Sequence, residues 1–112
     1  MDEQTARDAP AAEFGRALKG FGINLLVCDV TRSVDFLEKI LGMRVHRADA
    51  DFALLESAGH FIQLHADHTY HSNPLPSLLP EAAARGAGIE LRLYGIDPDA
   101  CEAKAIAGAH VA

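Results

Sequence analysis

The stretch GINLLVCDVTRSVDFLEKILG, residues 22–42, is the best-defined piece of local structure in the chain. Residues 23–27 form a short apolar run that is typical of a buried strand. Apolar residues then recur three or four positions apart until Gly42, and glycine commonly ends a helix. Asp29 or Thr31 can cap that helix, because either side chain accepts a hydrogen bond from an unpaired backbone N–H group. We therefore predict a strand that runs directly into an amphipathic helix.

A degraded copy of this stretch, GIELRLYGIDPDACEAKAIAG, occupies residues 88–108. The two copies align without a gap, with glycine at both ends and isoleucine at the second position of each. Asp97 or Asp99 is placed to cap the second helix, and Pro98 suits its first turn. Because a strand–helix unit used twice indicates an internal repeat, we predict a duplicated module.

Three further strands are predicted between the two copies, at residues 44–48, 52–56 and 61–66, with a hairpin turn at 57–60. The first module, residues 22–67, then has the order strand–helix–strand–strand–strand. In the last of these strands, alternate side chains face opposite sides of the sheet. The sequence therefore predicts one βαβββ unit before the copied stretch begins.

The remaining segments complete the expected organisation. Residues 1–20 are polar and alanine-rich, and we predict an N-terminal tail with one helical turn in it. A connector, residues 68–87, leads to a partial second module, residues 88–112, which is roughly 21 residues shorter than the first. We expect one domain, residues 21–112, of the α+β class, in which paired βαβββ modules with curved mixed sheets form a cleft and the second module is truncated.

Composition narrows the classes of partner. The chain has 112 residues, a net charge of −6 and a pI near 5.4. Nucleic acid or an anionic membrane surface would favour a basic protein, so we expect neither as a partner. No apolar run is long enough to cross a bilayer, and the acidic N-terminus does not resemble a signal peptide. Cys28 and Cys101 lie in unlike contexts without a CxxC motif, so we expect reduced thiols and a cytoplasmic protein.

The segments LLVCDVTRSVDFLEKILGMRV and ELRLYGIDPDA, together with the repeated βαβββ order, resemble the vicinal oxygen chelate superfamily. This is the fold of glyoxalases, bleomycin-resistance proteins and extradiol dioxygenases. The resemblance covers residues 22–111 and implies two modules around a shared cleft, usually in a homodimer. It specifies no single activity, because members of the group isomerise, epimerise, cleave rings, conjugate thiols or only bind drugs.

The resemblance also implies positions for a divalent metal. In metal-using members the first and last strands of each module supply the ligands, which corresponds here to Gly22, Gln63 and Glu90, with a fourth position beyond residue 112. Glycine offers no ligand atom. Asn24 lies on the same face and can stand in, although a neutral amide is a weak ligand for a transition metal. The divalent metal, held by Gln63 and Glu90, therefore stays an open expectation.

Several residues are candidates for a site. Glu90 is predicted as a metal ligand or general base, against the alternative of a charge pair with Arg92. His65 is predicted to contact a ligand beside Gln63, and a metal site shared by His65, His68 and His71 is the less favoured interpretation because their spacing is not that of a helical pair. His46 and His60 are expected to be exposed, and Cys28 to pack as a small apolar residue.

Two functions follow as alternatives. The first is a glyoxalase/bleomycin-resistance-like protein that binds a small organic molecule without the usual metal site. The second is a divalent-metal-dependent lyase, isomerase or dioxygenase of the same superfamily, with Glu90 as its catalytic residue. The predicted ligand-binding residues are Asn24, Phe61, Gln63, His65, Arg92 and Tyr94, with Leu26 as a further part of the apolar wall.

Overall fold

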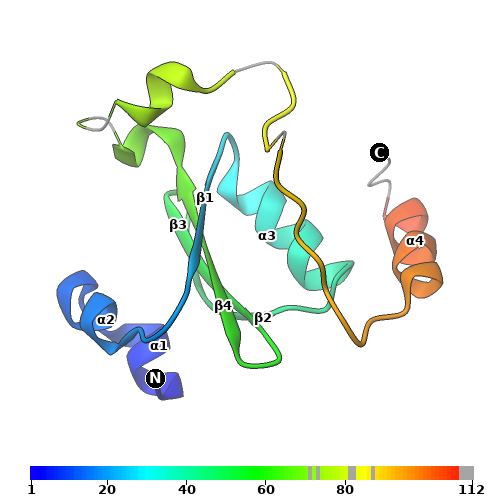
Figure 1. The fold of residues 1–112 in the computed structure, drawn as a ribbon. Coiled ribbons are helices and arrows are strands. Elements are labelled where there is room, and N and C mark those ends of the chain that lie inside the picture. Colours follow the sequence, from blue (N-terminus) through cyan, green and yellow to red (C-terminus); the bar gives the residue numbers. More distant parts are fainter. Residues whose placement is uncertain (71, 73, 81–82, 87, 109–112) are drawn as a thin grey trace.

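A computed structural model describes residues 1–70, 72, 74–80, 83–86 and 88–108. These residues form a mixed α+β structure with one four-stranded sheet and four α-helices (Figure 1). The strands are β1 (Ile23–Val27), β2 (Arg44–Ala48), β3 (Phe52–Ser57) and β4 (His60–Ala66). The helices are α1 (Glu3–Asp8), α2 (Ala11–Ala17), α3 (Val30–Lys39) and α4 (Pro98–Ala107), and two 3₁₀ turns follow β4 at Asp67–Tyr70 and Leu75–Leu78.

The sheet has the strand order β1-β4-β3-β2. β1 pairs with β4 in parallel, whereas β4 with β3 and β3 with β2 are antiparallel. The chain order from β1 through α3 to β4 is therefore strand–helix–strand–strand–strand, as predicted for residues 22–67. β1 forms an edge of the sheet, and β2 forms the other edge.

The junction between β1 and α3 forms as the sequence predicts. Of the two possible caps, Asp29 acts: its Oδ1 accepts a hydrogen bond of 3.0 Å from the backbone N–H of Arg32. The chain turns after α3 at Gly42, whose φ of 72° lies in the left-handed region that glycine adopts without strain. The tight turn between β3 and β4 likewise has positive φ at Ala58 and Gly59.

One face of the sheet packs against α3 and forms the main hydrophobic core. Inward-facing residues of β3 and β4, among them Leu55 and Leu64, are fully buried there beside Val30 of α3. Burying side chains of this size stabilises the fold by about 1.5–3 kcal/mol each. The alternation of buried and half-buried residues along β4 shows that its other side chains face away from α3.

The N-terminal residues differ from the predicted tail. They form α1 and α2, which cover part of the opposite face of the sheet (Figure 1). Ala6 and Phe14 are buried there against Leu54 of β3, so a second, smaller core lies on this side. The prediction missed it because the five alanines of residues 1–20 dilute the apolar signal, and only contact with the sheet completes the helices' burial.

Arg47 connects α1 to the sheet. Its guanidinium donates hydrogen bonds to the carbonyl oxygens of Arg7, at 3.0 Å, and Ala9, at 2.7 Å, and lies 5.4 Å from the centre of the Phe14 ring. A β-bulge between Val45 and Arg47 changes the register of β2 and directs Arg47 to this face. Arg47 thus satisfies carbonyl groups at the end of α1 that the helix itself leaves unpaired.

The second copy, residues 88–108, is only partly as predicted. Its helix forms as α4, with Asp97 as the cap and Pro98 in the first turn. The predicted strand at residues 88–94 is absent: this stretch is extended but pairs with no strand among the described residues. Its apolar side chains are exposed, with Ile89 at 67% and Leu91 at 51%. A strand forms only by pairing with a neighbouring strand, and among the described residues this stretch pairs with neither edge of the sheet.

The C-terminal part therefore does not pair with the first module in the structure. α4 buries none of its residues fully, and its alanines present no continuous apolar stripe. Figure 1 shows α4 to one side of the body, at the end of the extended segment. Among the described residues, no helix combines the length and apolar composition that crossing a bilayer requires.

Candidate ligand-binding site

The face of the sheet opposite α3 carries most of the predicted ligand-binding residues from the first module. In the β1–β4 pairing, Asn24 lies beside Gln63 and Leu26 beside His65. Phe61 precedes Gln63 by two residues on β4 and so faces the same side. The sequence thus predicted correctly that Asn24, Phe61, Gln63 and His65 share one face.

A cavity of about 450 Å³ opens on this face. Asn24, Phe61 and Gln63 line it from the sheet, which is called its floor here, and residues of the chain that connects α2 to β1 line it as well. The described lining residues are Met1, Ala17, Leu18, Lys19, Gly20, Phe21, Gly22, Ile23, Asn24, Gly59, Phe61 and Gln63. Three of the predicted ligand contacts therefore meet in one hollow, although it lies within the first module and its N-terminal helices rather than between two modules.

Gly22 contributes space to this cavity. A Cβ atom built at Gly22 would meet no atom within 4 Å, and its backbone is not in the left-handed region. The residue that the family resemblance aligned with a metal ligand thus lies beside Asn24 and Gln63, but it offers room in place of a side chain.

His65 adjoins the cavity through Gln63. Its Nε2 atom lies 3.2 Å from Oε1 of Gln63, and its ring lies 5.1 Å from that of Phe52 and 5.3 Å from that of Tyr70. Burial among these groups lowers the pKa of His65 below its usual value of 6.5, so the ring is neutral at neutral pH. A carbonyl oxygen only accepts, so Nε2 carries the ring proton and donates it to Gln63.

His46 differs from the expectation that it is exposed. Only 5% of its side chain is accessible, and its Nε2 lies 2.7 Å from Oε1 of Glu56. The ring also lies 5.6 Å from the ring of Phe61. The bulge in β2 causes this burial, because it places His46 and Arg47 on the same face. His60, in contrast, is exposed as expected.

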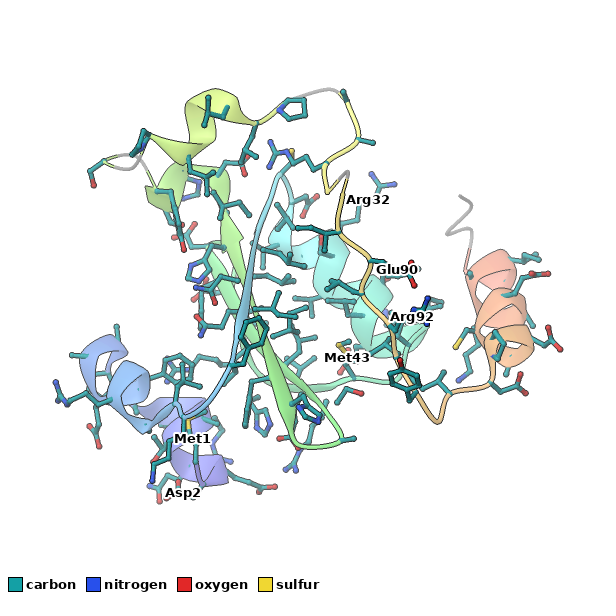
Figure 2. All side chains as sticks on the ribbon, viewed as in Figure 1. Met1, Asp2, Arg32, Met43, Glu90 and Arg92 are labelled. Atoms are coloured by element: carbon teal, nitrogen blue, oxygen red, sulfur yellow. The ribbon has the colours of Figure 1, made fainter. Side chains whose placement is uncertain are left out.

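The predicted site residues of the second copy lie elsewhere. Glu90 and Arg92 are exposed and form an ion pair with each other. Tyr94 is also exposed, and none of the three lines the cavity beside Gln63. Figure 2 shows Glu90 and Arg92 on the extended segment that leads to α4, whereas Met1 lies beside the N-terminal helices. The structure thus agrees with the alternative interpretation of Glu90, in which it pairs with Arg92.

The side chains on this face do not fit a divalent metal. Asn24 and Gln63 are neutral amides, and Glu90 lies on a different segment in its pair with Arg92. Within the described part of the chain, no three His, Cys, Asp or Glu residues come close enough together to hold an ion. His68 pairs instead with Asp51 at 2.8 Å, and His71 lies outside the described residues.

The two cysteines are not in a disulfide. Cys28 is exposed just beyond the end of β1, so the expectation that it packs as an apolar residue is wrong. β1 ends at Val27, the residue before Cys28, and the chain turns there to begin α3. Cys101 is half-buried on α4.

A second hollow, of about 580 Å³, lies between α3, the core face of β1 and α4. Its walls are mainly apolar and include Leu25, Phe36 and Cys101. It is larger than the cavity at Gln63, but it contains few polar groups that could orient a ligand. We therefore place the candidate site at the smaller cavity, which two amides and a lysine line.

Lys19 and Phe21 were not among the predicted site residues. Both belong to the segment interpreted as a tail and its link to β1, yet they form a wall of the cavity. The sequence does hold one signal, since Phe21 stands between Gly20 and Gly22 in a loop with no helical or strand pattern. Loops commonly carry binding residues, so an aromatic residue between two glycines in such a loop is a signal for a site.

Compared with protein-family models, with curated proteins and with solved structures, the chain gives no significant match to any of the three.

Proposed function

We propose that this protein binds a small organic molecule in the cavity between β1, β4 and the α2–β1 loop, as a glyoxalase/bleomycin-resistance-like protein. One observation carries the proposal: Asn24, Phe61 and Gln63 were predicted as ligand contacts, and they line one hollow of about 450 Å³. This volume is in the range of small-molecule sites, and the mixture of amide groups with an aromatic ring is typical of them. No metal takes part in the proposed binding.

Filling the cavity tests this function directly. In Gly22→Leu the new side chain enters open space at a backbone position that tolerates it, so the fold is retained. Gly15→Leu is the matched control, because a Cβ there also meets no atom within 4 Å and Gly15 does not line the cavity. A fragment library is screened by thermal shift and by NMR of the Gln63 side-chain amide.

The proposal expects fragments that bind the wild-type protein and Gly15→Leu but not Gly22→Leu. It is overturned if no fragment perturbs the Gln63 amide, or if Gly22→Leu binds as well as the wild type. Elemental analysis gives a second, independent criterion. Stoichiometric zinc, nickel, iron or manganese that is lost in Glu90→Ala would support the metal-dependent enzyme in place of the metal-free binding protein.

We also propose that the protein acts as a homodimer. The observation in favour is that Ile89, Leu91 and Leu93 are exposed at alternate positions of an extended segment, and that β1 pairs with β4 alone among the described residues. Exposed strand edges and apolar stripes of this kind pair readily with another chain. Sedimentation equilibrium tests it: a dimer that dissociates in Leu91→Lys is expected, and a wild-type monomer at tens of micromolar contradicts it.

A further inference from the structure

The cavity differs in charge from the protein as a whole. The chain carries 16 acidic residues and a net charge of −6. Among the described lining residues, however, Lys19 has the only charged side chain and none is acidic. A hollow with a cation but no carboxylate attracts an anion, and the attraction increases where the ligand is partly shielded from water.

Gln63 adds an oriented donor to this cation. Its Oε1 is already used by His65 Nε2, at 3.2 Å. Within the described part of the chain, the NH₂ group of Gln63 has no protein acceptor. Because an amide presents donor and acceptor on opposite branches, fixing the oxygen on His65 leaves the two N–H groups for a molecule in the cavity. The neighbouring amide of Asn24 can act in the same way.

Phe21 provides an apolar surface that the described residues leave almost fully exposed. Its side chain is 93% exposed, although it lines the same cavity as Phe61. Gly20, with a φ of 77°, and Gly22 flank it, so this loop adjusts at little steric cost. An exposed phenylalanine at the rim of a polar-floored hollow is the kind of group that becomes buried when a ligand binds.

We propose that this cavity selects a small carboxylate that carries a flat apolar body. The carboxylate accepts hydrogen bonds from the Gln63 amide and is near the Lys19 ammonium, while the apolar body lies between Phe61 and Phe21. His65 is a positioning residue, which acts through Gln63. This inference rests on the proposed function, since it names the class of ligand for the same site.

Three probes of matched shape test the selection: 2-naphthoate, its neutral amide 2-naphthamide and the cation 2-naphthylmethylammonium. Affinity is measured by titration calorimetry, and contact at the site by the shift of the Gln63 side-chain N–H resonances. Naphthoate is expected to bind at least tenfold more tightly than either analogue. The difference in affinity between naphthoate and its two analogues should decrease when the salt concentration rises from 50 mM to 500 mM, because salt screens the charge of an exposed lysine.

Substitutions test which residues of the cavity contact the carboxylate of the ligand. Gln63→Leu should weaken naphthoate roughly tenfold, since a hydrogen bond to a charged group is lost. Lys19→Met should weaken it about threefold, because the ammonium is exposed. The matched controls, Gln4→Leu and Lys104→Met, change exposed residues that do not line the cavity and should leave the affinity unchanged.

Phe21→Ser separates binding from folding. The side chain is almost fully exposed, so the melting temperature should stay within a degree of the wild type, while naphthoate affinity falls about tenfold through lost apolar contact. Tighter or equal binding of the amide or the cation overturns the carboxylate assignment but leaves the proposed function standing. Failure of all three probes and of the fragment library overturns both.

Discussion

Nε2 of His65 and Oε1 of Gln63 lie 3.2 Å apart on successive outward-facing positions of β4. His65 packs beside the rings of Phe52 and Tyr70, and Gln63 lines the cavity, so this contact links the aromatic cluster to the cavity. Side chains two residues apart on a strand point the same way, so the backbone itself brings this pair together. The imidazole thereby favours the orientation of Gln63 in which the amide oxygen points to His65.

We expect His65→Phe to weaken naphthoate binding about fivefold without large loss of stability. Phenylalanine keeps the ring between Phe52 and Tyr70, but it removes the donor to Gln63, and the loss of one hydrogen bond corresponds to about 1 kcal/mol. Titration calorimetry measures the affinity, and NMR of the Gln63 amide shows whether its orientation is lost. His65→Gln, which can donate from its own amide, should restore part of the affinity; equal affinity in all three proteins contradicts the positioning role.

The pH dependence of stability should include a contribution from His65. Burial lowers the pKa of His65 in the folded state, so the unfolded chain binds a proton more readily. Stability from this group is complete above its unfolded value of 6.5 and is lost as the pH falls below 6.5 through the lower folded pKa. Urea unfolding between pH 7.5 and 5 should show a smaller loss in His65→Phe than in the wild type. The exposed His60→Phe should lose as much as the wild type, and an unchanged loss in His65→Phe would rule this contribution out.

Arg47→Ala should release α1 from the sheet. The variant loses two hydrogen bonds to the carbonyl groups of Arg7 and Ala9 as well as the contact with the Phe14 ring. We expect a loss of about 1–3 kcal/mol in the free energy of unfolding, and faster amide exchange in residues 3–9. Arg16→Ala, an exposed arginine on α2, is the control and should change neither quantity. Unchanged exchange in Arg47→Ala would show that the apolar contacts alone hold α1.

Asp67 and Arg85 should control how firmly the connector is attached to the sheet. Arg85 donates to both carboxylate oxygens of Asp67, at 2.6 and 2.8 Å, and its Nη1 also lies 3.3 Å from the carbonyl oxygen of Leu26 on β1. These hydrogen bonds from Arg85 lower the pKa of Asp67, so their contribution is present above the unfolded value of 3.8 and is lost as the pH falls through the folded pKa.

We expect Arg85→Lys to keep the charge but lose the two-pronged geometry, and to reduce stability by about 1 kcal/mol. Limited proteolysis of the connector should be faster in Arg85→Lys and in Asp67→Asn than in the wild type. The exposed Arg32→Lys is a control in which the cleavage rate should not change. Equal rates in all four proteins would mean that this ion pair does not hold the connector.

The sequence was most informative where residues close together in the chain determine the structure. β1 ends at the predicted residue, and Asp29 caps α3 because a short acceptor side chain before a helical stripe needs no distant partner. The shared face of Asn24, Gln63 and His65 was also correct, since strand alternation determines it. Prediction was poorest for the N-terminal helices and for residues 88–94, whose structure depends on what they contact.

By itself, then, the sequence determined the βαβββ order of residues 22–67 and the faces on which its side chains lie, because spacing along the chain controls both. The tertiary structure alone decided which side chains meet. It brought Lys19 and Phe21 to the floor residues Asn24 and Gln63, buried His46 through a bulge, and left Glu90 paired with Arg92 at the surface. Contacts between segments far apart in sequence depend on packing, register and the closure of loops, and these have no local signature.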